Sequence, residues 1–259
     1  AEATTDLRVA TLVYDVDYRH PVVLAKEIAT LDLVSNGRVE FGIGAGWMSD
    51  DYDTAGIPFD KAGIRIDRMV EAIDVVRGLW SGQPLNFQGE HYVVRDMTGA
   101  PSPCQPGGPP IIVGGGGKRV LTEAARRADI VGLNASLHSG SVGPETALSA
   151  LGERFLERRN WVEEAAGERF SQLELQMNTF MTAVTATTAE ADEMIEGMAP
   201  MFGLSPDQAR TIPMVLAGTV NDVCEQLHHH RELYGTSYWV IHEGEVDAMA
   251  PVVAKMSGT

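Results

Sequence analysis

The stretch "VEFGIGAGW", residues 39–47, carries glycine at every second position: Gly42, Gly44 and Gly46. Residues two apart in a β-strand face the same side, so one face of this predicted strand bears no side chains. Glycine weakens a strand, and its use here marks a bulge or the close approach of something flat or bulky. One interpretation is a layer of small residues inside a barrel that makes room for a neighbour's large side chain. The other is a ligand that lies against the bare backbone.

Predicted strands and helices alternate on both sides of this stretch. Apolar, β-branched segments predict strands, whereas apolar residues at helical spacing, with Pro, Thr or Gly at the ends, predict helices. The predicted strands are residues 7–15, 38–46, 111–117, 129–136, 173–184, 214–219 and 236–243. The predicted helices are residues 20–37, 61–80, 118–128, a helix that runs through Trp161, helices within 187–210, and 220–235 and 245–256, with Thr219 capping the helix that follows it.

This alternation predicts the fold class. Strands that are apolar on both faces and alternate with helices indicate a parallel sheet. A doubly wound sheet and a (β/α)8 barrel both satisfy that rule. At 259 residues, a single barrel domain over residues 1–259, with a hairpin at residues 84–94 inside an insertion at about 81–110, is the better fit.

Composition narrows the function. The chain is 44% hydrophobic and 22% charged, which is typical of a globular protein. We find no apolar run of the roughly 18 residues that a membrane span needs and no signal-peptide pattern, so we expect a soluble, cytoplasmic protein. The two cysteines, Cys104 and Cys224, are expected to be reduced thiols. A formal net charge of −16 repels phosphate backbones and argues against nucleic acid as a partner.

The segment "IIVGGGGKR" predicts an anion site. A buried strand runs into four glycines, Gly114, Gly115, Gly116 and Gly117, and then into the start of a helix. Bare backbone N–H groups and the positive end of a helix dipole favour a phosphate, and Lys118 and Arg119 add positive charge. The alternative is a tight turn, but a turn does not require four glycines in succession.

The loops after the predicted strands hold the candidates for proton transfer. His20, Asp50, Asp51 and His138 could each move a proton, although each is also plausible as a solvated or capping residue. Consecutive histidines at 228–230 point to different sides of a helix and cannot converge on one ion, so we predict a solvated helix end and no metal site.

Together these motifs resemble one family. "LDLVSNGRVEFGIGAGW", "RIDRMVEAIDVVRGLWSG", "FQGEHY" and "PPIIVGGGGKRVLTEAARRADIVGL" resemble the bacterial-luciferase-like oxidoreductases, and most of all the branch that uses the deazaflavin coenzyme F420. The likeness runs from about Leu7 to the end of the chain. It implies a (β/α)8 barrel, a homodimer, and two β/α units, roughly 50 residues, before the first strand of this chain.

The resemblance also assigns a cofactor site. It implies that an isoalloxazine-type ring lies across the barrel mouth, backed by Thr11, Leu12, Val13, Ala45 and Gly46. A non-prolyl cis peptide, by position Leu12–Val13, would form a bulge behind the ring. The cofactor phosphate would bind at Gly114 to Gly117.

The resulting hypothesis is an oxidoreductase that transfers a hydride between coenzyme F420 and a small organic substrate. His20, Trp47 and Asp51 are the residues we expect to shape the substrate pocket or move a proton. The alternatives are an FMN-dependent monooxygenase on the same fold, a non-catalytic flavin-binding protein, and, last, a doubly wound nucleotide-binding protein.

Overall fold

The computed structural model describes residues 1–138, 140 and 142–258. The chain divides into two compact units: Ala1–Val113 with Glu123–Ile130, and Gly114–Thr122 with the residues from Val131 onward. The predicted His138 lies in the described part of the chain, and is exposed. No helix in the described ranges combines the length and the apolar character that crossing a membrane would require.

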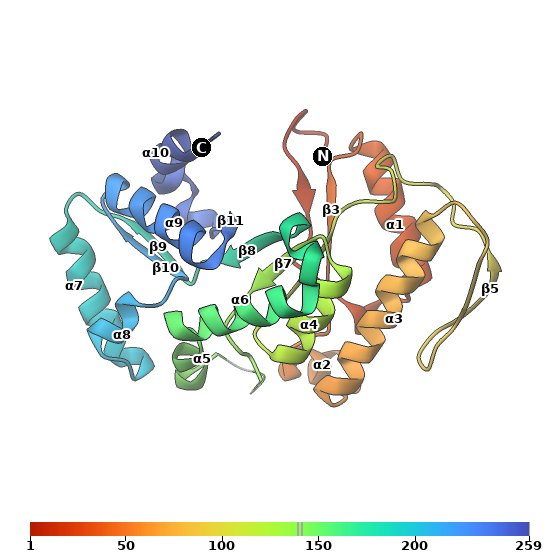
Figure 1. The fold of residues 1–259 in the computed structure, drawn as a ribbon, viewed down its shortest axis with the longest axis horizontal. Coiled ribbons are helices and arrows are strands. Elements are labelled where there is room, and N and C mark those ends of the chain that lie inside the picture. The colour runs from red at the N-terminus through yellow and green to blue at the C-terminus, as the bar shows by residue number, and fades with distance from the viewer. Residues whose placement is uncertain (139, 141, 259) are drawn as a thin grey trace. The chain divides into compact units, whose positions relative to one another are not determined.

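The first unit follows the predicted order of strands and helices (Figure 1). Its elements are β1 (Val9–Ala10), β2 (Tyr14–Asp15), the 3-10 helix η1 (Val16–Tyr18), α1 (Pro21–Val34), β3 (Val39–Gly44), α2 (Ser49–Ala55), α3 (Ala62–Trp80), β4 (Leu85–Gln88), β5 (Val93–Met97) and the first part of β6 (Ile111–Gly115). Both β1 and β6 pair in parallel with β3, and β4 and β5 form the predicted antiparallel hairpin. Every residue of β3 is buried, which fits a central parallel strand.

Helices α1 and α3 pack side by side over the core of this unit (Figure 1). The Trp80 indole meets the Phe41 ring of β3 edge-on, with centroids 5.8 Å apart, and its Nε1–H donates to Ala25 O of α1 at 2.9 Å. The last residue of α3 thus ties both helices to the glycine-bearing strand.

The predicted strand 7–15 is interrupted, which corrects that expectation. Ala10 pairs with Glu40, and Tyr14 pairs with Ile43. Between these two pairs the chain advances four residues on the β1–β2 side and three residues on β3. One extra residue between two paired positions is a β-bulge. The Thr11 side chain replaces the missing ladder, since its Oγ1 accepts from Gly42 N and donates to Gly42 O, both at 3.1 Å. The peptide Leu12–Val13 within the bulge is cis, as predicted.

The second unit holds the remaining elements. They are the last part of β6, the start of α4 (Lys118–Arg127), β7 (Ile130–Leu133), α5 (Pro144–Ser149), α6 (Gly152–Ala166), η2 (Gly167–Gln172), β8 (Glu174–Asn178), β9 (Met181–Val184), α7 (Thr188–Met198), η3 (Ala199–Phe202), α8 (Pro206–Arg210), β10 (Val215–Gly218), α9 (Val220–Tyr234), β11 (Thr236–Val240), η4 (Glu243–Glu245) and α10 (Val246–Met256). Its main sheet has the strand order β7-β8-β11.

The predicted strand 173–184 is wrong as a single element. It divides into β8, which pairs with β11, and β9, which pairs with β10 in a separate two-stranded parallel sheet. The exchange of partners occurs at two residues: Thr179 N donates to Val240 O at 2.9 Å, and Phe180 N donates to Met214 O at 2.7 Å. A pattern of apolar residues reports burial and cannot report which strand is the neighbour.

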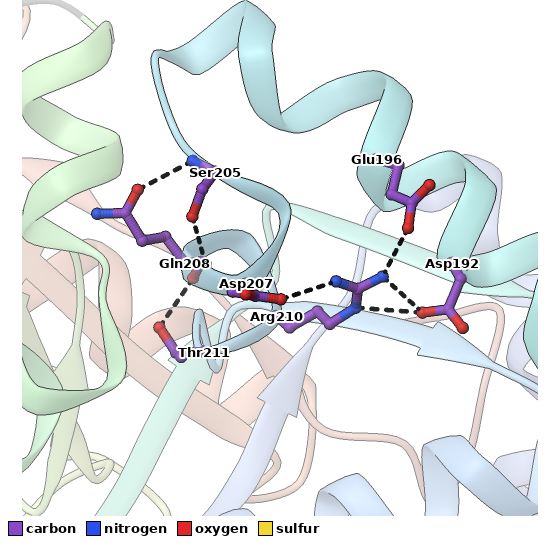
Figure 2. Close-up of polar contacts among 7 residues, drawn as sticks. All are labelled: Asp192, Glu196, Ser205, Asp207, Gln208, Arg210 and Thr211. Atoms are coloured by element: carbon purple, nitrogen blue, oxygen red, sulfur yellow. Dashed lines mark hydrogen bonds and ion pairs between the residues drawn. The ribbon is translucent and has the colours of Figure 1, made fainter.

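Helices α7 and α8 are joined by a surface network of ion pairs and caps (Figure 2). The Arg210 guanidinium lies within ion-pair distance of Asp192, Glu196 and Asp207, and Ser205 caps α8 through a reciprocal pair of bonds with Gln208. Exposed ion pairs contribute little individually, so the cap is the stronger local determinant of this short helix.

Candidate functional site

The bare face of β3 is filled by the protein's own atoms. A Cβ on Gly42 would lie 2.0 Å from the Thr11 carbonyl oxygen, and one on Gly44 would lie 2.6 Å from Val13 Cγ2. Real Cβ atoms essentially never approach below 3.0 Å, so both positions require glycine unless the bulge moves. These two glycines therefore make room for a neighbouring segment, as in the first of the two interpretations of the glycine pattern.

The other side of the bulge is open. Leu12 and Val13 are 46% and 41% exposed although both are apolar. One side of the bulge at residues 11–13 therefore packs against β3, and its other side exposes apolar surface.

Gly46 faces a buried polar cluster at the end of β3. Its φ of 70° is in the left-handed region that favours glycine, and a Cβ would lie 1.9 Å from the Tyr52 hydroxyl and 2.5 Å from Asp15 Oδ2. Ala45 and Gly46 therefore pass close to Asp15, which follows directly from the register Asp15–Gly44 of β2 and β3.

The cluster itself is a chain of charged and polar groups. The Tyr52 hydroxyl lies 2.9 Å from Asp15 Oδ1 and 2.8 Å from Asp17 Oδ2. Arg68 forms ion pairs with Asp17 and with Asp60. Because these side chains come from β2, η1, α2, α3 and the residues just before α3, the packing of separate elements brings the cluster together.

Burial changes the acidity of this cluster. It raises the pKa of Asp15, against the opposing effect of the hydrogen bond from Asp17 N. It also raises the pKa of the Tyr52 phenol far above the usual value, and the two neighbouring carboxylates add to that rise. A raised carboxyl pKa at the end of a parallel strand marks a candidate functional group.

The residues predicted to be catalytic lie around this strand end in the first unit. His20 caps α1, its Nδ1 accepting from Val22 N at 3.3 Å, and its ring meets the Tyr92 ring edge-on at 5.2 Å. Trp47 is partly exposed just after β3, and Asp51 is exposed in the first turn of α2. Asp50 is exposed beside it. None of these contacts assigns a catalytic role, so that role stays a prediction.

The glycine loop of the second unit is only partly free. A Cβ on Gly115 would lie 2.3 Å from Val120 Cγ1, and one on Gly116 would lie 2.4 Å from Ala135 O. A Cβ on Gly114 would lie 2.9 Å from Asn134 Nδ2. Close packing thus accounts for three of the four glycines, whereas Gly117 faces open space at the start of α4, where Leu121 N donates to Gly117 O at 3.2 Å.

Arg158 of α6 adds a positive charge beneath this loop. It is 4% exposed, its Nε donates to Gly116 O at 2.9 Å and its Nη1 to Ser149 O at 2.6 Å. Within the described ranges no carboxylate forms an ion pair with it, and burial lowers its pKa to about 10. A buried cation that is hydrogen-bonded only to neutral carbonyls favours an anion nearby.

Sequence reasoning missed Asp15, Asp17, Tyr52 and Arg158. Arg158 carried a usable signal, since it shares the buried face of α6 with Phe155 and Val162 at helical spacing. Asp15, Asp17 and Tyr52 carried none, because their meeting depends on contacts between residues 35 and 37 positions apart.

The histidines of α9 depart partly from expectation. His228 and His229 are exposed, as predicted for a solvated helix end. His230 instead turns inward and stacks on Trp239 at 5.5 Å, and burial lowers its pKa to about 4. In the described part of the chain, no group of three or more His, Cys, Asp or Glu residues could hold a metal ion.

Comparison with known proteins identifies the family of the chain. The protein-family model described as luciferase-like monooxygenase matches residues 1–253. The F420-dependent glucose-6-phosphate dehydrogenase of Amycolatopsis mediterranei is 33% identical over 130 residues, which cover 50% of this chain and 38% of that protein. The FMNH(2)-dependent dimethylsulfone monooxygenase of Pseudomonas putida is 30% identical over 109 residues, 42% of this chain and 30% of that protein.

A solved structure shows the same fold. The coenzyme F420 dependent tetrahydromethanopterin reductase of Methanopyrus kandleri superposes with a TM-score of 0.75 at 17% identity, covering 97% of this chain and 82% of that one. This likeness confirms the predicted α/β fold of the luciferase-like (β/α)8 barrel type. The aligned segments span less than half the length of the curated relatives.

Proposed function

Because the chain belongs to the luciferase-like monooxygenase family, we propose that it is an oxidoreductase that transfers a hydride between coenzyme F420 and a small organic substrate. The relatives include F420-dependent and FMN-dependent enzymes, and the curated F420-dependent relative is the more similar of the two described above. The bound cofactor would supply the redox chemistry, and the protein would supply binding and orientation.

The proposal is supported by an open glycine and a buried guanidinium at the glycine loop of the second unit. Gly117 is open at the N-terminus of α4, and Arg158 lies buried beside Gly116 without a carboxylate partner in the described ranges. A phosphate there would receive backbone N–H groups and the positive end of the helix dipole, and would balance the buried guanidinium. Lys118, whose Nζ lies 6.0 Å from the centre of the Trp161 ring, adds a cation at the same helix end.

The ring would be bound in the first unit. Its supports would be Thr11, Leu12 and Val13, whose open side is apolar, together with Ala45 and Gly46. His20, Trp47 and Asp51 would line the substrate side. A homodimer and a cytoplasmic location stay predictions of the sequence.

A pair of variants at Gly117 tests the phosphate site. Aspartate and asparagine are both favourable helix N-caps and nearly equal in size, so G117D and G117N should fold equally well. They differ by one negative charge at the site. Fluorescence titration with coenzyme F420, and separately with FMN, should give micromolar or tighter binding of the deazaflavin to the wild type.

The charged variant should then bind about 10-fold to 100-fold more weakly than the neutral one, as like-charge repulsion near a surface predicts. Equal affinities for G117D and G117N would contradict phosphate binding at this loop. Preference for FMN, with rapid oxygen consumption by reduced FMN, would favour the monooxygenase. Tight binding without turnover of any substrate would favour a non-catalytic flavin-binding protein.

A further inference from the structure

The polar cluster at the end of β2 and β3 has too few protons if all its carboxylates are ionised. The Tyr52 oxygen lies at hydrogen-bond distance from two carboxylate oxygens, 2.9 Å from Asp15 Oδ1 and 2.8 Å from Asp17 Oδ2. A phenol carries one proton and can donate it to only one of them. The second short oxygen–oxygen contact needs a second proton, and a carboxyl group is the one place that can hold it.

The contacts decide which carboxyl holds the proton. Asp17 is paired with the Arg68 guanidinium, and its side chain is 2% exposed. Asp15 receives only the Asp17 N–H, at 2.9 Å, on the oxygen that faces Tyr52. Among the described residues none donates to Asp15 Oδ2. Tyr52 therefore donates to Asp17, and Asp15 donates to Tyr52.

Charged groups from three elements face Asp15: the Asp17 carboxylate favours its protonated form, and the Arg65 guanidinium opposes it. Asp17 and Tyr18 face it from η1, Tyr52 from α2, and Arg65 from α3. Arg65 is 7% exposed, stacks on Phe59 at 3.8 Å, and has Nε and Nη1 without hydrogen-bond partners.

Asp15 also lies where chemistry is expected. It ends β2, pairs with Gly44, and places Oδ2 against the backbone of Gly46. In (β/α)8 enzymes the reacting groups lie at the carboxyl ends of the strands. Burial raises the pKa of Asp15 above its usual value, which favours the protonated form of a group in this position.

We propose that Asp15 holds the second proton of this cluster and is the proton donor and acceptor in hydride transfer to and from an alcohol–carbonyl substrate. This inference rests on the proposed function. In the reducing direction the carbonyl carbon receives the hydride that the reduced deazaflavin gives up, and the carbon–oxygen π bond breaks. The oxygen takes the proton from Asp15, which becomes a carboxylate. In the oxidising direction each transfer reverses.

The proton itself can be measured without cofactor or turnover. Carbon-detected NMR of Asp-labelled, cofactor-free protein follows each carboxyl through a pH titration, and D15N identifies the Asp15 signal. We expect the midpoint of Asp15 to lie well above the value of about 3.9 for an unperturbed aspartate. A midpoint near or below 5 overturns the inference and leaves the proposed cofactor binding untouched.

The variants test the catalytic part. Asparagine has the shape of a neutral carboxyl group and can still donate to Tyr52, so D15N should fold and bind coenzyme F420 as the wild type does. It should lose about 10²–10⁴-fold in kcat, the usual effect of removing a general acid. D53N, which removes an exposed carboxylate of α2, is the control and should retain activity. If D15N binds F420 normally and its kcat is unchanged, the role of Asp15 is overturned. If the wild-type protein does not bind F420, the proposed function is overturned instead.

Discussion

Replacing Gly42 by alanine tests the packing that separates β3 from the Thr11–Val13 bulge. The added Cβ would lie 2.0 Å from Thr11 O, and a separation of at least 3.0 Å is needed, so the carbonyl would have to move by about 1 Å. Thr11 cannot move alone, because its Oγ1 is bonded to both Gly42 N and Gly42 O.

The magnitude follows from those contacts. Overpacking a tight site costs about 1–3 kcal/mol, and each neutral hydrogen bond that is strained costs up to about 1 kcal/mol. We therefore expect G42A to lower the free energy of unfolding by about 3 kcal/mol. For a chain of this size that corresponds to a fall of about 6–12 °C in the melting temperature of the first unit.

Two further alanine variants make the test specific. At Gly44 the obstacle is only the Val13 side chain, so G44A should cost less, about 1–2 kcal/mol. Gly197 lies in α7, where an added methyl group would meet no other atom within 4 Å, and G197A should stabilise by about 0.5–1 kcal/mol. Thermal and urea unfolding followed by circular dichroism measure all three. Equal effects of G42A and G44A, or a G42A as stable as the wild type, would refute the reasoning.

Three other predictions concern regions outside β3. The Glu71 carboxylate accepts the backbone N–H groups of residues 90, 91 and 92, and these hydrogen bonds outweigh burial and lower its pKa. E71Q should therefore lower the unfolding free energy by about 1–2 kcal/mol in urea titrations at pH 7. The difference between E71Q and the wild type should shrink as the pH falls through that lowered pKa. S205A should lower the melting temperature more than R210A does, because the Ser205 helix cap contributes about 1 kcal/mol whereas Arg210 makes only exposed ion pairs (Figure 2). Salt at about 0.5 M screens exposed ion pairs and should abolish any effect of R210A. Burial lowers the pKa of His230 to about 4, so as the pH falls the unfolded chain binds a proton at this histidine before the folded protein does. The unfolding free energy of the wild type should therefore fall between about pH 6.5 and 4, by up to about 3 kcal/mol relative to H230Q. Parallel pH profiles of the two proteins would count against the burial of His230.

Local signals were sufficient for most elements. The predicted helix 61–80 is α3 at Ala62–Trp80, and the predicted helix 220–235 is α9, which begins after the Thr219 cap. Helical periodicity and caps act within a few residues, so they can be read along the chain. The cis peptide at Leu12–Val13 was also anticipated, but through the family resemblance rather than through any local pattern.

The sequence by itself determined the alternation of strands and helices, the glycine face of β3 and the glycine run before α4. Only the tertiary structure decided what fills those bare positions: the Thr11 carbonyl and Val13 at β3, and the Ala135 backbone at Gly116. It also decided that the Tyr52 hydroxyl meets both Asp15 and Asp17 and that Arg158 is a buried cation. The physical reason is range, because periodicity and capping depend on neighbours within a turn, whereas close packing, desolvation and proton sharing depend on groups that meet only after the chain has folded.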